Sequence, residues 1–218
     1  MTLFASVLSL SRSDIQALRI RDPYSVHRVV YGLFEDVRST EQKESHFQSG
    51  ILYVDKGGDA TSRNILMLSD RQPARHATTS DGRPAGAVLS KVISENFLEH
   101  ARYQFKVVVN PTQRNNQSKK LIPIRSYAEI EQWFVERSSK DWGFKSTDLI
   151  VDDVQVLQFP NKAQQLVTLS HAHIHGLLAV TDRIAFQKSF AQGLGRNSAF
   201  GCGLLQLVPI IHNPFDFN

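Results

Sequence analysis

Residues 21–34 read RDPYSVHRVVYGLF and predict the first helix of the fold. Asp22 is a good N-cap, Pro23 suits the first helical position, and apolar residues then recur at helical spacing. Tyr24 and His27 lie three positions apart, so we expect their side chains to be neighbours near the start of this helix. The positive end of the helix dipole lies there and favours a nearby anion such as phosphate. Spacing alone leaves two interpretations open: a phosphate-facing site, or two side chains that only border the buried stripe.

The composition is that of a globular protein of a reducing compartment. The chain has 218 residues, of which 41% are hydrophobic, and a single cysteine, Cys202, which excludes an internal disulfide framework and cysteine-rich zinc sites. Residues 1–14 are apolar but lack a basic n-region, and Leu3, Ala5 and Val7 alternate with Phe4, Ser6 and Leu8, so we expect a first strand and not a signal peptide. No apolar stretch reaches the length of a membrane span. We therefore expect a cytoplasmic protein without a membrane partner.

The charge is unevenly distributed along the chain. The net charge is +4, and residues 100–128 contain no aspartate or glutamate. A basic region of this kind favours a polyanionic partner, most simply a nucleic acid, although a solvated basic face without a partner would look the same. The candidate phosphate contacts in this region are Arg102, Arg114, Lys119 and Lys120.

On both sides of this first helix, strand and helix patterns follow one another in the order βαββαβ, which occurs twice along the chain. This order predicts an α+β protein made of two tandem ferredoxin-like (RRM-like) domains. The polar segment NPTQRNNQSKK, residues 110–120, is the expected boundary, giving domains over 1–112 and 118–218. In the first half, the irregular segment 71–87 stands where the second helix is expected. The expected helices are 23–38, 126–139 and 182–192, and the expected strands are 2–10, 49–55, 64–70, 88–94, 101–109, 120–124, 151–159, 166–180 and 203–210.

The segment SHAHIHG is a candidate metal motif. His171, His173 and His175 alternate along a predicted strand, so their side chains share one face. Alternating positions spread them over roughly 13 Å, too far to converge on one ion without a bend. We expect no metal site here, although two of these histidines could contact phosphate.

The segment GLGRNSAFGCGLL, residues 193–205, follows a predicted helix and is rich in glycine. It is neither a P-loop nor a dinucleotide fingerprint. An ordinary helix-to-strand connection capped by its first glycine is one interpretation, and a loop that contacts a phosphate backbone is the one we favour. Its candidate contacts are Gly193, Gly195, Arg196, Asn197, Ser198, Gly201 and Gly203.

Four motifs in order resemble one known family. PYSVHRVVYGLF (23–34), KVVVNPTQ (106–113), HIHGLLAV (173–180) and GLGRNSAFGCGLLQLVP (193–209) are similar to the CasE family, the CRISPR RNA endoribonucleases of type I-E systems, within the repeat-associated mysterious protein superfamily. The resemblance implies tandem ferredoxin-like domains. It also implies an enzyme that cuts precursor CRISPR RNA at the base of each repeat hairpin and stays bound to the product. The implied partners are that hairpin and the other Cascade subunits, including the backbone subunit.

By position, His27 matches the catalytic histidine of the family and Tyr24 the accompanying tyrosine. RNA carries its own nucleophile, so we expect metal-independent cleavage, without a cofactor, to a 2′,3′-cyclic phosphate. Arg28 and Arg196 are candidates for stabilising the charge of the transition state. Two alternatives remain: a non-catalytic subunit that binds the crRNA hairpin, and a metal-dependent hydrolase built on the three histidines.

Overall fold

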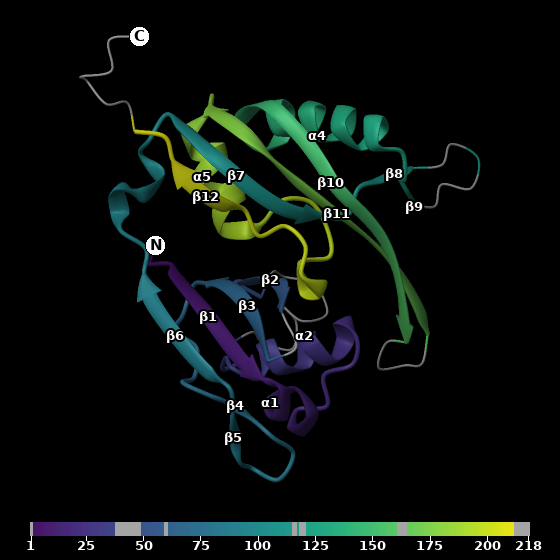
Figure 1. Ribbon diagram of the computed structural model, residues 1–218. Coiled ribbons are helices and arrows are strands. Elements are labelled where there is room, and N and C mark those ends of the chain that lie inside the picture. Colours follow the sequence, from purple (N-terminus) through teal and green to yellow (C-terminus); the bar gives the residue numbers. More distant parts are fainter. Residues whose placement is uncertain are drawn as a thin grey trace.

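The protein forms two four-stranded antiparallel sheets, which lie one above the other in Figure 1. Within each sheet the strands follow the spatial order second, third, first, fourth, which is that of a ferredoxin-like βαββαβ unit. The predicted fold class, α+β with two tandem ferredoxin-like units, is confirmed. The computed structural model describes residues 2–37, 49–58, 61–114, 117, 121–160 and 165–211.

The first sheet has the order β2-β3-β1-β6. A capping box at Asp22 begins α2, as predicted, and buried valines on this helix pack against the sheet. Residues 70–86, all described, contain a short β4–β5 pair and no helix, so the expectation that this segment replaces the second helix is confirmed. The elements are β1 (Phe4–Ser11), α1 (Arg12–Ala17), α2 (Pro23–Tyr31), β2 (Ile51–Gly58), β3 (Ser62–Ser69), β4 (Ala77–Thr78), β5 (Pro84–Ala85) and β6 (Ala87–Val92).

The second sheet has the order β10-β11-β7-β12, and helices α4 and α5 pack against it. Its long β10–β11 hairpin extends past the rest of the sheet toward α2, which β10 contacts (Figure 1). The elements are η1 (Glu95–Leu98), β7 (Arg102–Val109), β8 (Thr112–Arg114), β9 (Leu121–Pro123), α4 (Tyr127–Asp141), β10 (Phe144–Pro160), β11 (Leu166–Val180), α5 (Arg183–Gln192), η2 (Ser198–Phe200) and β12 (Gln206–Pro209).

One strand lies in the other half from the one expected. Strand 101–109 was expected to close the first half, but the structure pairs it, as β7, with β11 and β12 of the second sheet. Strand 120–124, expected to open the second half, is β9 and pairs with β8 alone. Periodicity identifies a strand but not its partner, because pairing is decided by distant residues. We propose that the division between the halves lies between β6 and β7.

Several element bounds also differ from those expected. The first helix ends at Tyr31, where Gly32 is the C-cap, and not at residue 38. Strand β10 begins seven residues before the expected position 151, and the last strand begins at Gln206 because residues 203–205 still belong to the glycine-rich loop. Helix α4 and strand β11 match the expected ranges closely. Among the described residues, no helix has both the length and the apolar character needed to cross a membrane.

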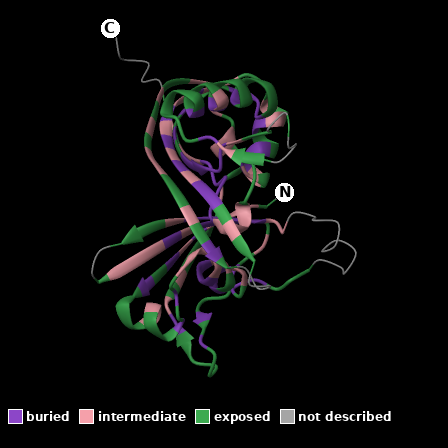
Figure 2. Cartoon of the chain, turned by 90° about the vertical axis from the view of Figure 1, so that its right-hand side faces the viewer, coloured by how far each residue is buried: buried purple, intermediate pink, exposed green. Residues whose placement is uncertain are grey.

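The two halves share a hydrophobic core. Leu52 and Val54 of β2 are buried in the same cluster as Phe105 of β7 and Leu194 of the glycine-rich loop. A second cluster lies between the first sheet and helices α1 and α2. Figure 2 shows buried residues along the central strands and exposed residues on the outward sides of the helices. The loop after α5 is therefore packed against the first half, which brings it to α2.

Candidate active site at the junction of the two halves

The N-terminus of α2 is held in a defined orientation. The Asp22 carboxylate accepts a hydrogen bond from the Ser25 backbone N–H at 2.7 Å, and the Ser25 hydroxyl accepts from the Asp22 backbone N–H at 2.9 Å. Val26, Val29 and Val30 bury the opposite face of the helix. This packing leaves the face with Tyr24 and His27 half-buried.

His27 contacts the glycine-rich loop directly. Its Nδ1 lies 2.8 Å from the carbonyl oxygen of Ala199 in η2. A carbonyl can only accept, so Nδ1 carries the hydrogen, and in the neutral ring the basic lone pair then belongs to Nε2. The loop therefore selects the tautomer in which Nε2 can take a proton.

Aromatic rings surround the imidazole. The Tyr24 ring lies 6.1 Å from that of His27 and stacks with it, which confirms that the two side chains share a face. Tyr31 lies closer, at 4.1 Å, and Phe200 of η2 lies at 5.6 Å. Tyr31 is not among the site residues predicted from the sequence, although its spacing of four residues from His27 is a signal for such a contact.

Two further side chains hold the η2 turn in place. The Tyr53 hydroxyl donates to the carbonyl of Ala199 at 2.9 Å, and the Nε2 of His171 lies 3.1 Å from the carbonyl of Phe200. Burial raises the pKa of Tyr53 well above its usual value, so the phenol remains a donor at neutral pH. Burial lowers the pKa of His171 below its usual value. Tyr53 comes from the first sheet and His171 from the second, so both halves fix this turn.

The glycines of the loop serve different purposes. Gly193 has φ +87°, and a Cβ there would lie 2.8 Å from the Leu52 side chain, whereas a Cβ on Gly195 would meet nothing within 4 Å. The backbone N–H groups of Gly193, Gly201 and Gly203 donate to carbonyls within the protein. The exposed part of the loop is therefore the better candidate for the predicted contact with phosphate. That part consists of Gly195, Arg196, Asn197 and the half-buried Ser198.

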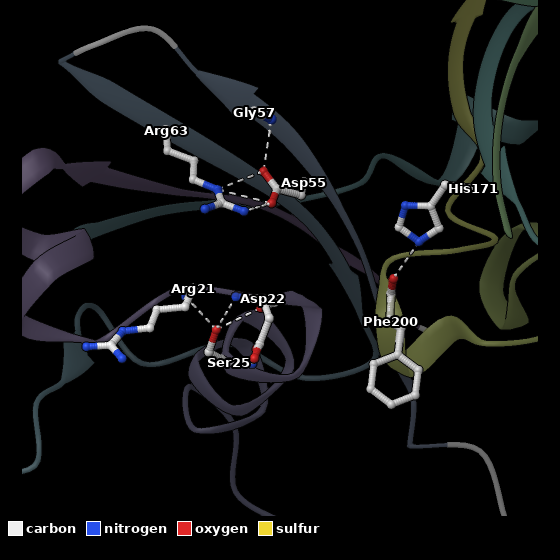
Figure 3. A network of polar contacts seen from close by, with 8 residues as sticks. All are labelled: Arg21, Asp22, Ser25, Asp55, Gly57, Arg63, His171 and Phe200. Atoms are coloured by element: carbon white, nitrogen blue, oxygen red, sulfur yellow. Dashed lines mark hydrogen bonds and ion pairs between the residues drawn. The ribbon is translucent and has the colours of Figure 1, made fainter. Parts of the chain in front are cut away.

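A groove of about 410 Å³ opens beside this turn, between the two halves. Its wall is formed by the N-terminus of α2, the ends of β2 and β3, and the β10–β11 hairpin. Arg63 pairs with Asp55 in this wall, and Figure 3 shows His171 reaching the Phe200 carbonyl from the opposite side. Its charged lining residues are the cations Arg21, Lys56 and Arg63 and the carboxylates Asp22 and Asp55, and His171 and His173 also line it.

A family model for CRISPR-associated proteins matches residues 3–209. The chain belongs to this CRISPR-associated protein family. The family resemblance seen in its motifs is thereby confirmed. No curated protein matches the chain significantly in sequence.

Solved structures share the fold of this CRISPR-associated protein. One is a CRISPR endoribonuclease Cse3 bound to a 19-nucleotide RNA, with 19% identity and a TM-score of 0.77, covering 96% of this chain and 100% of the other. A second is Thermus thermophilus Cse3 bound to an RNA representing a pre-cleavage complex, with 18% identity, a TM-score of 0.74 and the same coverage. A third is a chain of a CRISPR RNA-guided surveillance complex, with 17% identity and a TM-score of 0.64, covering 95% and 100%.

Other predicted RNA contacts of this CRISPR-associated protein lie away from His27. The Arg28 side chain donates to the carbonyl of Leu18, at the end of α1. Arg102 starts β7, about 20 Å along the strand from Val108, which contacts the loop. Arg114 is exposed on β8. Lys119 and Lys120 lie outside the described residues.

The three alternating histidines have separate surroundings. His171 contacts the η2 turn, His173 lines the groove, and His175 pairs with Asp152 at 2.8 Å. Within the described part of the chain, no three histidine, cysteine, aspartate or glutamate side chains are grouped so as to hold a metal ion. This geometry gives no support to the three-histidine hydrolase.

Proposed function

We propose that this CRISPR-associated protein is a metal-independent endoribonuclease that cuts CRISPR precursor RNA at the base of the repeat hairpin. The observation that carries the proposal is the contact of His27 Nδ1 with the Ala199 carbonyl. That contact leaves Nε2 as the basic nitrogen at the junction of the two halves, where Phe200, whose ring packs against His27, also lines the groove.

The chemistry follows from RNA itself. A base removes the proton of a 2′-hydroxyl, whose oxygen attacks the adjacent phosphorus, and the bond to the 5′-oxygen breaks as that oxygen gains a proton. The products are a 2′,3′-cyclic phosphate and a 5′-hydroxyl. His27 Nε2 takes the 2′-hydroxyl proton, because histidine is the side chain whose ordinary pKa lies nearest neutrality.

Two neighbours support this role. Tyr24, stacked beside His27, hydrogen-bonds the scissile phosphate. Arg196, on the exposed part of the loop, stabilises the negative charge of the transition state. Arg28 is the weaker candidate for this stabilisation because its guanidinium donates to Leu18.

The partners follow from the structural relatives. Cse3 structures contain bound RNA, and a chain of this fold occurs in an RNA-guided surveillance complex. We infer that this protein stays bound to the cleaved hairpin, the 3′ handle of the crRNA, within a Cascade complex that includes the backbone subunit. The crRNA-binding subunit without activity is the alternative that the experiment below separates from this proposal.

The test is cleavage of the protein's own repeat RNA in EDTA. Wild type should cut it once, and end mapping should find a 2′,3′-cyclic phosphate. His27→Ala should reduce the rate roughly 100- to 10,000-fold, the usual contribution of general acid–base catalysis, with unchanged RNA affinity. His76→Ala, at an exposed histidine, is the matched control.

A second substrate tests the internal nucleophile. An RNA with 2′-deoxyribose at the cleavage position should bind and remain intact. Cleavage of that RNA would contradict the proposed chemistry. Binding without any wild-type cleavage of the ribose substrate would support the non-catalytic subunit.

A further inference from the structure

A second cavity lies between α4, α5 and the glycine-rich loop. Its volume is about 490 Å³, and ligand sites typically span roughly 300–1,000 Å³. The loop contributes to both cavities, with Phe200 and Gly201 in the groove and Gly193, Gly195 and Arg196 here. We call this second cavity the α4–α5 pocket.

The α4–α5 pocket carries a positive charge. Arg137 and Asp141, four residues apart on α4, pair with each other at 2.6 Å and line the pocket together. Lys188 and Arg196 are exposed, and the described residues supply neither with an ion pair. Two cationic groups therefore remain for an anionic ligand.

The pocket also contains a donor without an acceptor. Trp133 lines it, and its Nε1 is buried with no hydrogen-bond partner among the described residues. Buried donors of this kind are rare, because an unmet N–H is costly. Because less than 1 Å² of this nitrogen is exposed, the half-buried indole ring of Trp133, and not its N–H, is the surface available to a base, with the buried Trp142 packed edge-on against it.

We propose that the α4–α5 pocket binds one nucleotide of the single-stranded RNA that flanks the repeat hairpin, with its phosphate at Lys188, while Arg196 of the adjoining loop contacts the scissile phosphate. This inference rests on the proposed function. The same loop connects the pocket to the proposed active site, because Arg196 lies three residues before Ala199, whose carbonyl contacts His27. Ammonium and guanidinium groups bind phosphate oxygens, and aromatic rings accept any base.

Intrinsic fluorescence reports on this pocket directly. The chain contains two tryptophans, Trp133 and Trp142, and both line it. Two RNAs with 2′-deoxyribose at the cleavage position are compared: the hairpin alone and the hairpin with both single-stranded flanks. The flanked RNA should change the emission, and the hairpin alone should not. Inorganic phosphate is the third probe and should produce a smaller change than the flanked RNA.

Affinity measurements provide the second arm. Lys188→Ala should weaken binding of the flanked RNA about fivefold, as expected for an exposed charge pair. It should also lower the slope of log Kd against log salt by about 0.7, the value for one single-strand phosphate. Binding of the hairpin alone should not change. Lys140→Ala, an exposed lysine of α4 outside the pocket lining, is the matched control.

Equal emission with both RNAs, or equal weakening of both by Lys188→Ala, would overturn the inference. A full response to inorganic phosphate alone would also overturn it and would indicate a site for free anions. Lys140→Ala should keep the wild-type cleavage rate and the wild-type affinity for both RNAs. If wild type bound the flanked RNA with this fluorescence change but never cut RNA, the proposed function would fail while the pocket assignment would stand.

Discussion

Tyr53 and His27 hydrogen-bond to the same atom, the backbone carbonyl oxygen of Ala199, at 2.9 and 2.8 Å. The phenol comes from a buried strand of the first sheet, and the carbonyl belongs to the loop that follows α5. Because that carbonyl holds Nδ1–H of His27, anything that moves it also moves the proposed general base. Tyr53 is thus a positioning residue for His27.

Tyr53→Phe should slow RNA cleavage with unchanged RNA affinity. Loss of one hydrogen bond worth about 1 kcal/mol corresponds to roughly a fivefold lower rate if it acts fully on the transition state. Tyr103→Phe is the control, because that buried phenol donates to the Phe97 carbonyl at 2.9 Å, away from the site. Single-turnover kinetics measures the cleavage rate of both variants, and urea unfolding measures their stability, so a rate loss caused by displacement of His27 can be distinguished from one caused by unfolding. Equal rates for the two variants would refute the positioning role.

Removing the Tyr24 hydroxyl should affect the chemistry, and removing that of Tyr31 should not. Tyr24→Phe should lower the cleavage rate about ten- to hundredfold, because its hydroxyl serves the scissile phosphate. The Tyr31 hydroxyl contacts the Ser49 hydroxyl at 2.9 Å, so Tyr31→Phe keeps the ring beside His27 and should cleave at nearly the wild-type rate. Single-turnover cleavage rates of the two variants test this assignment. A larger loss in Tyr31→Phe than in Tyr24→Phe would contradict it.

His171 should make stability depend on pH. Burial lowers its pKa in the folded protein, so below about 6.5 the unfolded chain binds this proton more readily than the folded protein does. The free energy of unfolding should therefore fall as pH drops below that value, whereas above pH 7 the ring is neutral in both states. Urea unfolding between pH 5 and 8 measures the slope.

His171→Gln should flatten this dependence, because glutamine does not titrate and can still donate to the Phe200 carbonyl. His76→Gln, at an exposed position, is the control and should retain the wild-type slope. An unchanged slope in His171→Gln would show that other groups cause the effect.

Two glycines of the loop should respond differently to alanine. Gly193→Ala should lose about 2 kcal/mol of unfolding free energy, because φ +87° with ψ 159° is a conformation that glycine alone adopts readily and the Cβ would press on Leu52. Gly195 has φ +78°, but a Cβ there would meet no other atom within 4 Å, so Gly195→Ala should cost only the backbone strain of about 1 kcal/mol. Urea titration at neutral pH compares them, and equal losses would contradict the packing role of Gly193.

The start of α2 was predictable because its signals are local. An N-cap aspartate, a proline at the first helical position and apolar spacing all act within two turns, and they bring Tyr24 and His27 to one face. The glycine-rich loop was predictable for the same reason. Its contact with His27 was not, because 172 residues separate the two partners of that hydrogen bond.

Local sequence signals were enough to predict two successive βαββαβ-like units, the absence of the second helix from the first of them, and the face that Tyr24 and His27 share. Periodicity, caps and turn residues carry this information because they act between near neighbours. Tertiary structure alone decided that β7 joins the second sheet, that Tyr53 and His171 hold the η2 turn, and that Trp133 and Lys188 share a pocket. Those outcomes depend on strand pairing and on the burial of a core common to both halves, which join residues far apart in the chain.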